Sequence, residues 1–194
     1  KITGVGGVFR VIPPKIPSMK DLGLPKVVEK MLHAHQGMIL VTGATGTGKS
    51  TTLAAMIDWL NRNRKFNIIT LEDPIEFMHE SNASLVVQRS VGLHVDSFAA
   101  GLHAALREDP DVILVGELRD PETISMAMTA AETGHLVLGT LHTSSAVKTL
   151  DRIIDAMPAE VKPQAATFNK RNIGNYIILG DFNFVILQIF GVDI

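Results

Sequence analysis

The residues best suited to chemistry lie in a glycine-rich segment, residues 43–50, which matches the pattern G-x-x-x-x-G-K-[ST] at every fixed position. Glycines permit a tight loop whose backbone N–H groups point at phosphate oxygens, and a following helix adds partial positive charge. In such a loop Lys49 reaches the β- and γ-phosphates and the Ser50 hydroxyl ligates Mg²⁺. The alternative, a chance Gly-rich turn, is disfavoured by the apolar stretch before it and the helical pattern after it. We therefore predict that ATP binds at Gly43, Ala44, Thr45, Gly46, Thr47, Gly48, Lys49, Ser50 and Thr51.

Two acidic clusters follow apolar stretches that are typical of strands, at residues 67–71 and 112–115. Ligands of open α/β sheets bind at the carboxyl ends of the strands, where these clusters would lie. We predict that Glu117 is the metal-side carboxylate, directly or through a water, and that Glu76 or Glu72 orients the attacking water. Each carboxylate alone could equally be a solvated loop charge or a helix cap. Their clustering beside a phosphate loop favours a catalytic role.

Two histidines flank a further apolar stretch at residues 136–140. His142 follows this expected strand and would lie at the catalytic edge, where a γ-phosphate sensor sits. His135 precedes the strand and would lie at the opposite edge unless the loop folds back. A lone histidine is more often structural than functional, but both stay candidate catalytic residues. The others have no motif context and are interpreted as surface or structural residues: His33, His35, His79, His94 and His103.

Alternating strand and helix patterns must position these residues. Four nearly all-apolar strands separated by helices indicate an α/β fold, a mainly parallel sheet flanked by helices on both faces. A short strand is also expected at 85–88. Asp96 is expected to cap one helix, and Asp120, followed by Pro121, another. The expected helices cover residues 21–36, 49–61, 97–107, 121–133 and 146–157.

Composition limits the class of protein. The chain has 194 residues, 46% of them hydrophobic, which is enough for a packed core and excludes a disordered chain. The net charge of −2 argues against a dedicated duplex-DNA binder. Without cysteine, disulfides and Cys-ligated metals are excluded. We expect no membrane span and no signal peptide. Lys1 is not Met, so we expect a piece of a longer protein.

The chain resembles the secretion and type IV pilus motor ATPases. Four motifs carry the resemblance: the Walker A loop at 43–51, an acidic "Asp box" at 69–76, a variant Walker B strand at 109–120 and a "His box" at 133–143. The resemblance covers about residues 9–165. It divides the chain into the end of an N-terminal domain plus a linker at 1–20, a RecA-like P-loop ATPase domain at 21–167 and an unassigned tail at 168–194.

The resemblance implies an ATP-hydrolysing motor that uses Mg²⁺ and works as a homohexameric ring. Its place would be the cytoplasmic face of a bacterial inner membrane, with an inner-membrane pilus platform protein as partner and no direct nucleic acid. Nucleotide would bind between this domain and a small N-terminal domain, with arginines supplied partly across an interface. Glu108 and Glu132 stand where assembly and export ATPases more often have Gln. These glutamates favour the branch that drives pilus retraction and twitching motility.

Three alternatives stay open at this point. An assembly or secretion ATPase of the same family shares all four motifs. A nucleic-acid translocase on a RecA-like core would want a basic channel, which the charge of −2 and the lack of a basic run longer than Lys170-Arg171 disfavour. A nucleotide-binding regulator without turnover is disfavoured by the intact Lys49, Glu76 and Glu117.

Overall fold

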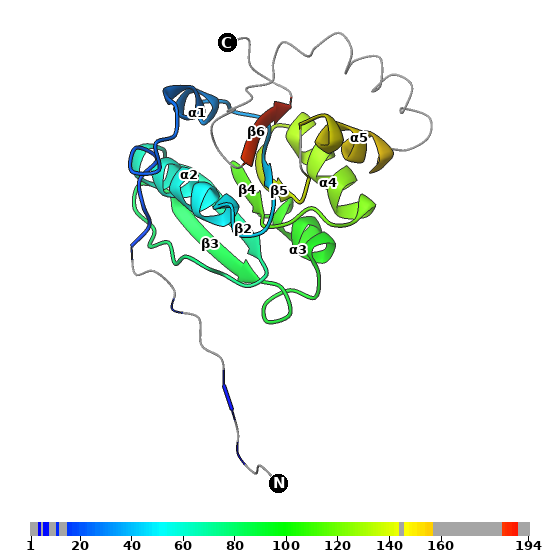
Figure 1. Ribbon diagram of the computed structural model, residues 1–194, viewed down its shortest axis with the longest axis horizontal. Helices are drawn as coiled ribbons and strands as arrows, with labels where there is room; N and C mark the ends of the chain where they lie inside the picture. Colours follow the sequence, from blue (N-terminus) through cyan, green and yellow to red (C-terminus); the bar gives the residue numbers. More distant parts are fainter. Residues whose placement is uncertain are drawn as a thin grey trace.

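A six-stranded sheet with helices on both faces forms the body of the chain (Figure 1). The computed structural model describes residues 15–143, 146–156 and 184–189, together with Gly4, Gly6, Gly7 and Val11. The strand order is β3-β2-β4-β5-β1-β6, and all pairs are parallel except β1 with β6. The predicted α/β fold with a mainly parallel sheet is confirmed. The strands are β1 (Gly37–Gly43), β2 (Asn67–Glu72), β3 (Leu85–Ser90), β4 (Val112–Val115), β5 (Leu136–Leu141) and β6 (Phe184–Ile189).

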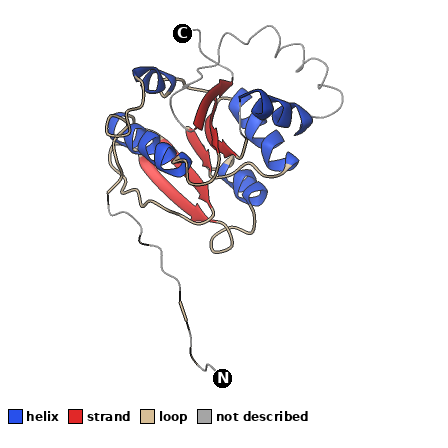
Figure 2. Ribbon diagram, viewed as in Figure 1, coloured by secondary structure: helices blue, strands red, loops and turns tan. Residues whose placement is uncertain are grey.

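The central strands are apolar because both of their faces are covered. Every residue of β1, β4 and β5 is buried. Figure 2 shows the resulting three layers, with the sheet between two sets of helices. One core cluster joins α1 and α2 to one face, and a second joins α3, α4 and α5 to the other. The helices are α1 (Lys26–Met31), α2 (Lys49–Asn63), α3 (Phe98–Ala105), α4 (Pro121–Glu132) and α5 (Ala146–Ala156).

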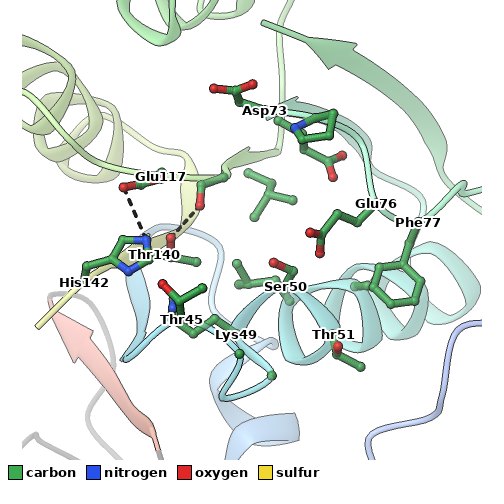
Figure 3. Close-up of a pocket in the computed structure, with 18 of the residues that line it drawn as sticks. Thr45, Lys49, Ser50, Thr51, Asp73, Glu76, Phe77, Glu117, Thr140 and His142 are labelled. Carbon is green, nitrogen blue, oxygen red and sulfur yellow. Dashed lines mark hydrogen bonds and ion pairs between the residues drawn. The ribbon is translucent and has the colours of Figure 1, made fainter. Parts of the chain in front are cut away.

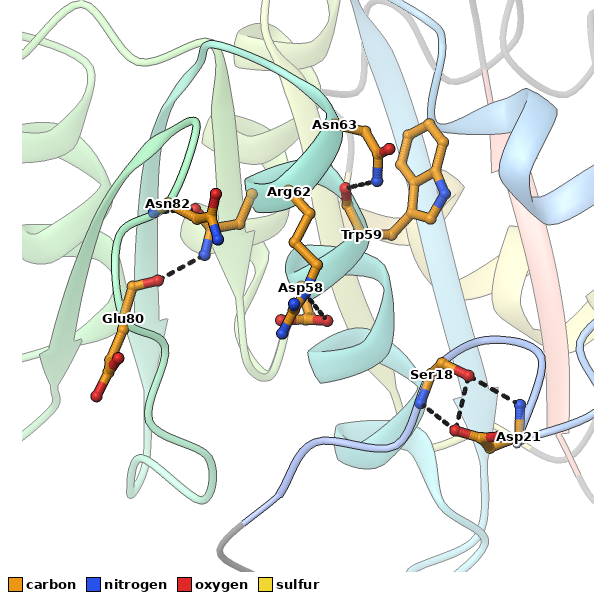
Figure 4. Close-up of polar contacts among 9 residues, drawn as sticks. Ser18, Asp21, Asp58, Trp59, Arg62, Asn63, Glu80 and Asn82 are labelled. Atoms are coloured by element: carbon orange, nitrogen blue, oxygen red, sulfur yellow. Dashed lines mark hydrogen bonds and ion pairs between the residues drawn. The ribbon is translucent and has the colours of Figure 1, made fainter.

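Two helix boundaries depart from the sequence-based expectation. The predicted cap Asp96 is wrong: Ser97 has the extended backbone of an N-cap and accepts a hydrogen bond from the Ala100 N–H at 3.1 Å. The helix expected over 21–36 is confined to α1. Upstream of it, Ser18 and Asp21 exchange side-chain hydrogen bonds in a turn (Figure 4), and Gly23 has φ of 68°. Asp120 caps α4 as expected, accepting from the Thr123 N–H at 2.8 Å.

The segment that the sequence leaves unassigned contributes β6. This strand runs antiparallel to β1, from Met38 opposite Ile189 to Gly43 opposite Phe184. The rest of 168–194 lies outside the described residues, and so does the strand-like stretch at 9–12 except Val11. Within the described part of the chain, no helix has the length and apolar character that crossing a membrane requires.

Candidate active site

The phosphate-loop sequence forms the connection between β1 and α2. Gly46 and Gly48 have φ of 82° and 96°, a left-handed conformation that glycine adopts without the steric cost of a Cβ atom. Gly48 is the N-cap residue of α2 and has no side chain with which to cap it. Position 48 therefore supplies no side-chain cap to the first backbone N–H groups of this 15-residue helix, and uncapped N–H groups at a helix N-terminus favour an anion.

The side chain of Lys49 folds back onto the first residues of this loop. Its Nζ donates hydrogen bonds to the carbonyl oxygens of Gly43 at 3.0 Å and Ala44 at 2.9 Å. The residue is only 8% exposed, and burial lowers the pKa of its ammonium group while the charge of Glu117 opposes that shift. A phosphate oxygen is a stronger acceptor than either carbonyl because it carries charge. The loop therefore holds a cation directly beside its cradle of N–H groups.

A cleft of about 510 Å³ opens above the loop, at the carboxyl ends of the strands. Figure 3 shows the labelled side chains converging on it from several elements. The segment after β2 supplies one wall and the turns after β4 and β5 supply another. The polar and aromatic lining residues include Thr45, Lys49, Ser50, Thr51, Glu72, Asp73, Glu76, Phe77, His79, Phe98, Glu117, Arg119, Thr140 and His142.

Glu117 is held between the side chains of Arg119 and His142. One of its carboxylate oxygens lies 2.7 Å from an Arg119 guanidinium nitrogen, and the other lies 3.3 Å from Nε2 of His142. The hydrogen bond from Arg119 is the main cause that lowers the pKa of the Glu117 carboxyl. The hydroxyl of Thr140 donates to the Gly116 carbonyl at 2.5 Å and so ties β5 to the turn that presents Glu117. The predicted convergence of Glu117 and His142 at one edge of the sheet is thus observed.

Glu72 and Glu76 have different surroundings. One oxygen of Glu72 accepts hydrogen bonds from the Thr70 hydroxyl at 2.7 Å and from Gln88 Nε2 at 3.0 Å. Burial raises the pKa of the Glu72 carboxyl, and a hydrogen bond from the Glu76 backbone opposes that shift. Figure 3 shows the Glu76 carboxylate pointing into the cleft toward Ser50, across from Glu117. Glu72 is thus engaged within the protein, whereas Glu76 reaches the side on which phosphates would lie.

His135 does not join this group. Its ring Nδ1 lies 3.0 Å from the Ala130 carbonyl oxygen, and its own carbonyl accepts from the Gly37 N–H at 3.1 Å. Because His135 precedes β5 and His142 follows it, six strand residues or about 20 Å separate the two. His135 stabilises the turn between α4 and β5 through its contact with Ala130. It lies at the opposite edge of the sheet from His142, as expected.

Several lining residues escaped sequence reasoning. Asp73 and Arg119 lie within the motifs at 69–76 and 109–120, and Phe77 directly follows the first of these, and this placement was the available signal. His79 was interpreted as a surface or structural residue, but it lines the cleft, and burial lowers the pKa of its imidazole.

Ser50 and Glu117 fit a magnesium site. Both line the same cleft, and hydroxyl and carboxylate oxygens are the ligands that Mg²⁺ prefers. Among the described residues, no group of three or more His, Cys, Asp or Glu side chains could hold a metal ion. Two protein oxygens suit Mg²⁺, which commonly completes its octahedron with waters and substrate phosphates.

Comparison with known proteins agrees with a nucleotide site at this cleft. Residues 15–165 match the type II/IV secretion system protein family. The chain is 53% identical to the type IV pilus ATPase PilT of Pseudomonas aeruginosa over 174 residues, which is 90% of this chain and 51% of that protein. It is 58% identical to a twitching motility protein of Neisseria gonorrhoeae over 159 residues, 82% of this chain and 42% of that protein.

A solved structure agrees with these sequence matches. The crystal structure of the pilus retraction motor PilT with bound ADP aligns with a TM-score of 0.81 at 47% identity, covering 94% of this chain and 56% of that one. The chain therefore spans about half the length of the relatives it matches.

Proposed function

Because this chain belongs to the type II/IV secretion system protein family, we propose that it is the catalytic core of an ATP-hydrolysing motor that drives retraction of a type IV pilus. The observation that carries the proposal is the convergence of Lys49, Glu76 and Glu117 on one cleft above a phosphate loop. The similarity to a pilus retraction ATPase and a twitching motility protein supports the direction of the motor.

Binding begins at the loop and the start of α2. The triphosphate of ATP receives the backbone N–H groups, and Lys49 exchanges its two carbonyl partners for β- and γ-phosphate oxygens. Ser50 and Glu117 would hold Mg²⁺, and the ion would neutralise charge on the phosphate oxygens. Bound ADP in the PilT crystal structure supports nucleotide as the ligand.

Hydrolysis then requires an oriented water. Glu76 reaches into the cleft on the Ser50 side, so its carboxylate orients the water and accepts a proton from it. Glu72 is committed to hydrogen bonds with Thr70 and Gln88 and holds the segment that carries Glu76. His142 contacts Glu117 and lies at the end of β5. In this scheme it acts as the sensor of the γ-phosphate.

The working assembly is a homohexamer at the cytoplasmic face of the inner membrane, acting on an inner-membrane pilus platform protein. Neighbouring subunits and an N-terminal domain complete the nucleotide site and supply further arginines. The match to the type II/IV secretion system protein family supports this assignment.

A secretion or pilus-assembly ATPase is the second candidate, because the family includes type II and type IV secretion proteins. One residue favours retraction, because Glu108 stands where assembly and export ATPases more often have Gln. Glu108 forms a bidentate pair with Arg89, with both N–O distances 2.8 Å. A Gln at that position, more usual in assembly and export ATPases, would lose the charge of this pair.

Complementation tests the proposal. The full-length gene is expressed in a pilated bacterium that lacks its own retraction ATPase, alongside a Lys49→Ala version. The proposal predicts that the wild-type gene restores twitching and the variant does not. Restoration of secretion in a strain lacking its secretion ATPase, without twitching, would favour the second candidate instead.

A further inference from the structure

One side chain outside every sequence motif fastens the segment that carries Glu76. Gln88 lies in β3, directly opposite Thr70 of β2 in the register of the two strands. Its Nε2 donates to Glu72 Oε1 at 3.0 Å and to the Phe77 carbonyl at 2.8 Å. Its Oε1 accepts from the His79 backbone N–H at 2.7 Å.

These contacts use both ends of the amide. The two N–H groups of Nε2 each have an acceptor, and the oxygen has a donor, so the amide has a single favourable orientation. The contacts also lie on both sides of Glu76, with Glu72 before it and Phe77 and His79 after it. Two of the contacts hold backbone atoms just after Glu76. The third holds the Glu72 carboxylate, which itself accepts a hydrogen bond from the Glu76 backbone, so one half-buried side chain restrains the segment on both sides of Glu76.

We propose that Gln88 is a positioning residue for Glu76, and that its amide sets the geometry with which the Glu76 carboxylate meets the attacking water. The inference rests on the proposed function. A displacement of about 1 Å at a reacting group can cost about 100-fold in rate, so a side chain that only fixes a backbone can still govern turnover. Gln88 itself touches neither nucleotide nor water in this scheme.

The far half of the same segment is held separately. Asn61 in α2 donates to the Glu80 carbonyl at 2.7 Å and accepts from the Asn82 N–H at 3.0 Å. Figure 4 shows Glu80 and Asn82 in this second contact region, near the end of α2. Ser81 accepts from the Val86 N–H of β3 at 3.0 Å. Loss of the Gln88 contacts should therefore loosen the Glu76 region while the rest of the segment stays in place.

The test compares three variants of the full-length protein. Gln88→Met keeps the size of the side chain and removes all three hydrogen bonds. Ser81→Ala is the matched control, because it removes another hydrogen bond between the same segment and the same strand. We expect Gln88→Met to lower kcat about tenfold with KM for ATP within about twofold of wild type. Ser81→Ala should leave both constants unchanged. An unchanged kcat in Gln88→Met, or an equal loss in Ser81→Ala, would overturn the inference.

Gln88→Glu gives a readout that a merely structural role would not move. It sets a second carboxylate against Glu72 Oε1, and two carboxylates in contact share a proton with a raised pKa. That proton restores a donor toward Glu72, so kcat of this variant should rise as pH falls from about 8 to 6, relative to wild type. A pH profile parallel to that of wild type contradicts the proposal, even if Gln88→Met fails to fold.

Failure of the proposed function can be told apart from failure of this inference. If the wild-type protein has no ATPase activity, the proposed function is wrong. Hydrogen exchange at the amides of residues 76–79 then tests the Gln88 contacts separately from catalysis. It should be faster in Gln88→Met than in Ser81→Ala, and equal rates in the two variants would contradict the inference.

Discussion

Nε2 of His142 lies 3.3 Å from a carboxylate oxygen of Glu117, and this contact joins the ends of two neighbouring strands on one wall of the cleft. The strands β4 and β5 are parallel, with Val115 opposite Gly139, so the residues that follow each strand emerge side by side. Two residues that are 25 positions apart in sequence thus form one unit beside the phosphate loop.

The first prediction concerns Lys49. Lys49→Ala removes the cation beside the loop, so ATP hydrolysis should fall below detection while the fold is kept. Phosphate release and circular dichroism measure the two effects. Lys65→Ala removes an exposed lysine outside the cleft and serves as the control. Normal turnover in Lys49→Ala would remove the basis for the phosphate-loop assignment.

The second prediction concerns metal binding by Glu117. Glu117→Gln removes a negative charge from the proposed Mg²⁺ site, so the Mg²⁺ concentration for half-maximal ATPase activity should rise about tenfold. A Mg²⁺ titration of the ATPase rate measures it. His142→Gln is the comparison variant, because it changes the partner of Glu117 but leaves the carboxylate. An unchanged Mg²⁺ requirement in Glu117→Gln would exclude this carboxylate from the metal site.

Features that depend on residues close together in the sequence could be predicted from it. The phosphate loop was predictable because its glycines, Lys49 and Ser50 are consecutive and each has a fixed role. Placement of His142 at the cleft followed from the direction of its strand. Gln88 was not predictable, because it acts only once β3 pairs with β2. The different surroundings of Glu72 and Glu76 likewise depend on contacts between strands, and β6 depends on a partner about 150 positions earlier in the chain.

The third prediction concerns stability and pH. The Arg119 hydrogen bond is the largest cause of the lowered pKa of Glu117, so this carboxylate stabilises the fold above its ordinary titration range, and that contribution is lost as pH falls through its folded pKa. Arg119 is 60% exposed, so Arg119→Met should cost at most about 1 kcal/mol. The difference in unfolding free energy should be present at about pH 7 and vanish toward about pH 3.

Urea unfolding of both proteins across that pH range provides the measurement. A difference that grows as the solution becomes more acidic would show that the contact does not act through the ionised carboxylate of Glu117.

The fourth prediction concerns the turn that presents Glu117. A Cβ atom at Gly116 would lie 3.0 Å from the Leu71 carbonyl oxygen and 3.3 Å from the Glu72 Cα. Backbone cannot move aside cheaply, so Gly116→Ala should displace the turn and lower kcat, with a stability loss of about 1–3 kcal/mol.

Gly101→Ala is its matched control. The added Cβ would lie 2.9 Å from a side-chain carbon of the same residue, Leu71, which can shift. This variant should lose stability without losing kcat per folded molecule. Equal effects of the two substitutions on kcat would contradict the role assigned to the Gly116 turn.

Single-turnover hydrolysis by Glu76→Gln tests the central claim most directly. The full-length protein and the variant are each loaded with ATP and Mg²⁺, and bound nucleotide and released phosphate are followed together. The neutral amide cannot accept the proton of the attacking water, so the variant should bind ATP with wild-type affinity and keep it intact while wild type releases phosphate. Phosphate release by Glu76→Gln at the wild-type rate would contradict the account.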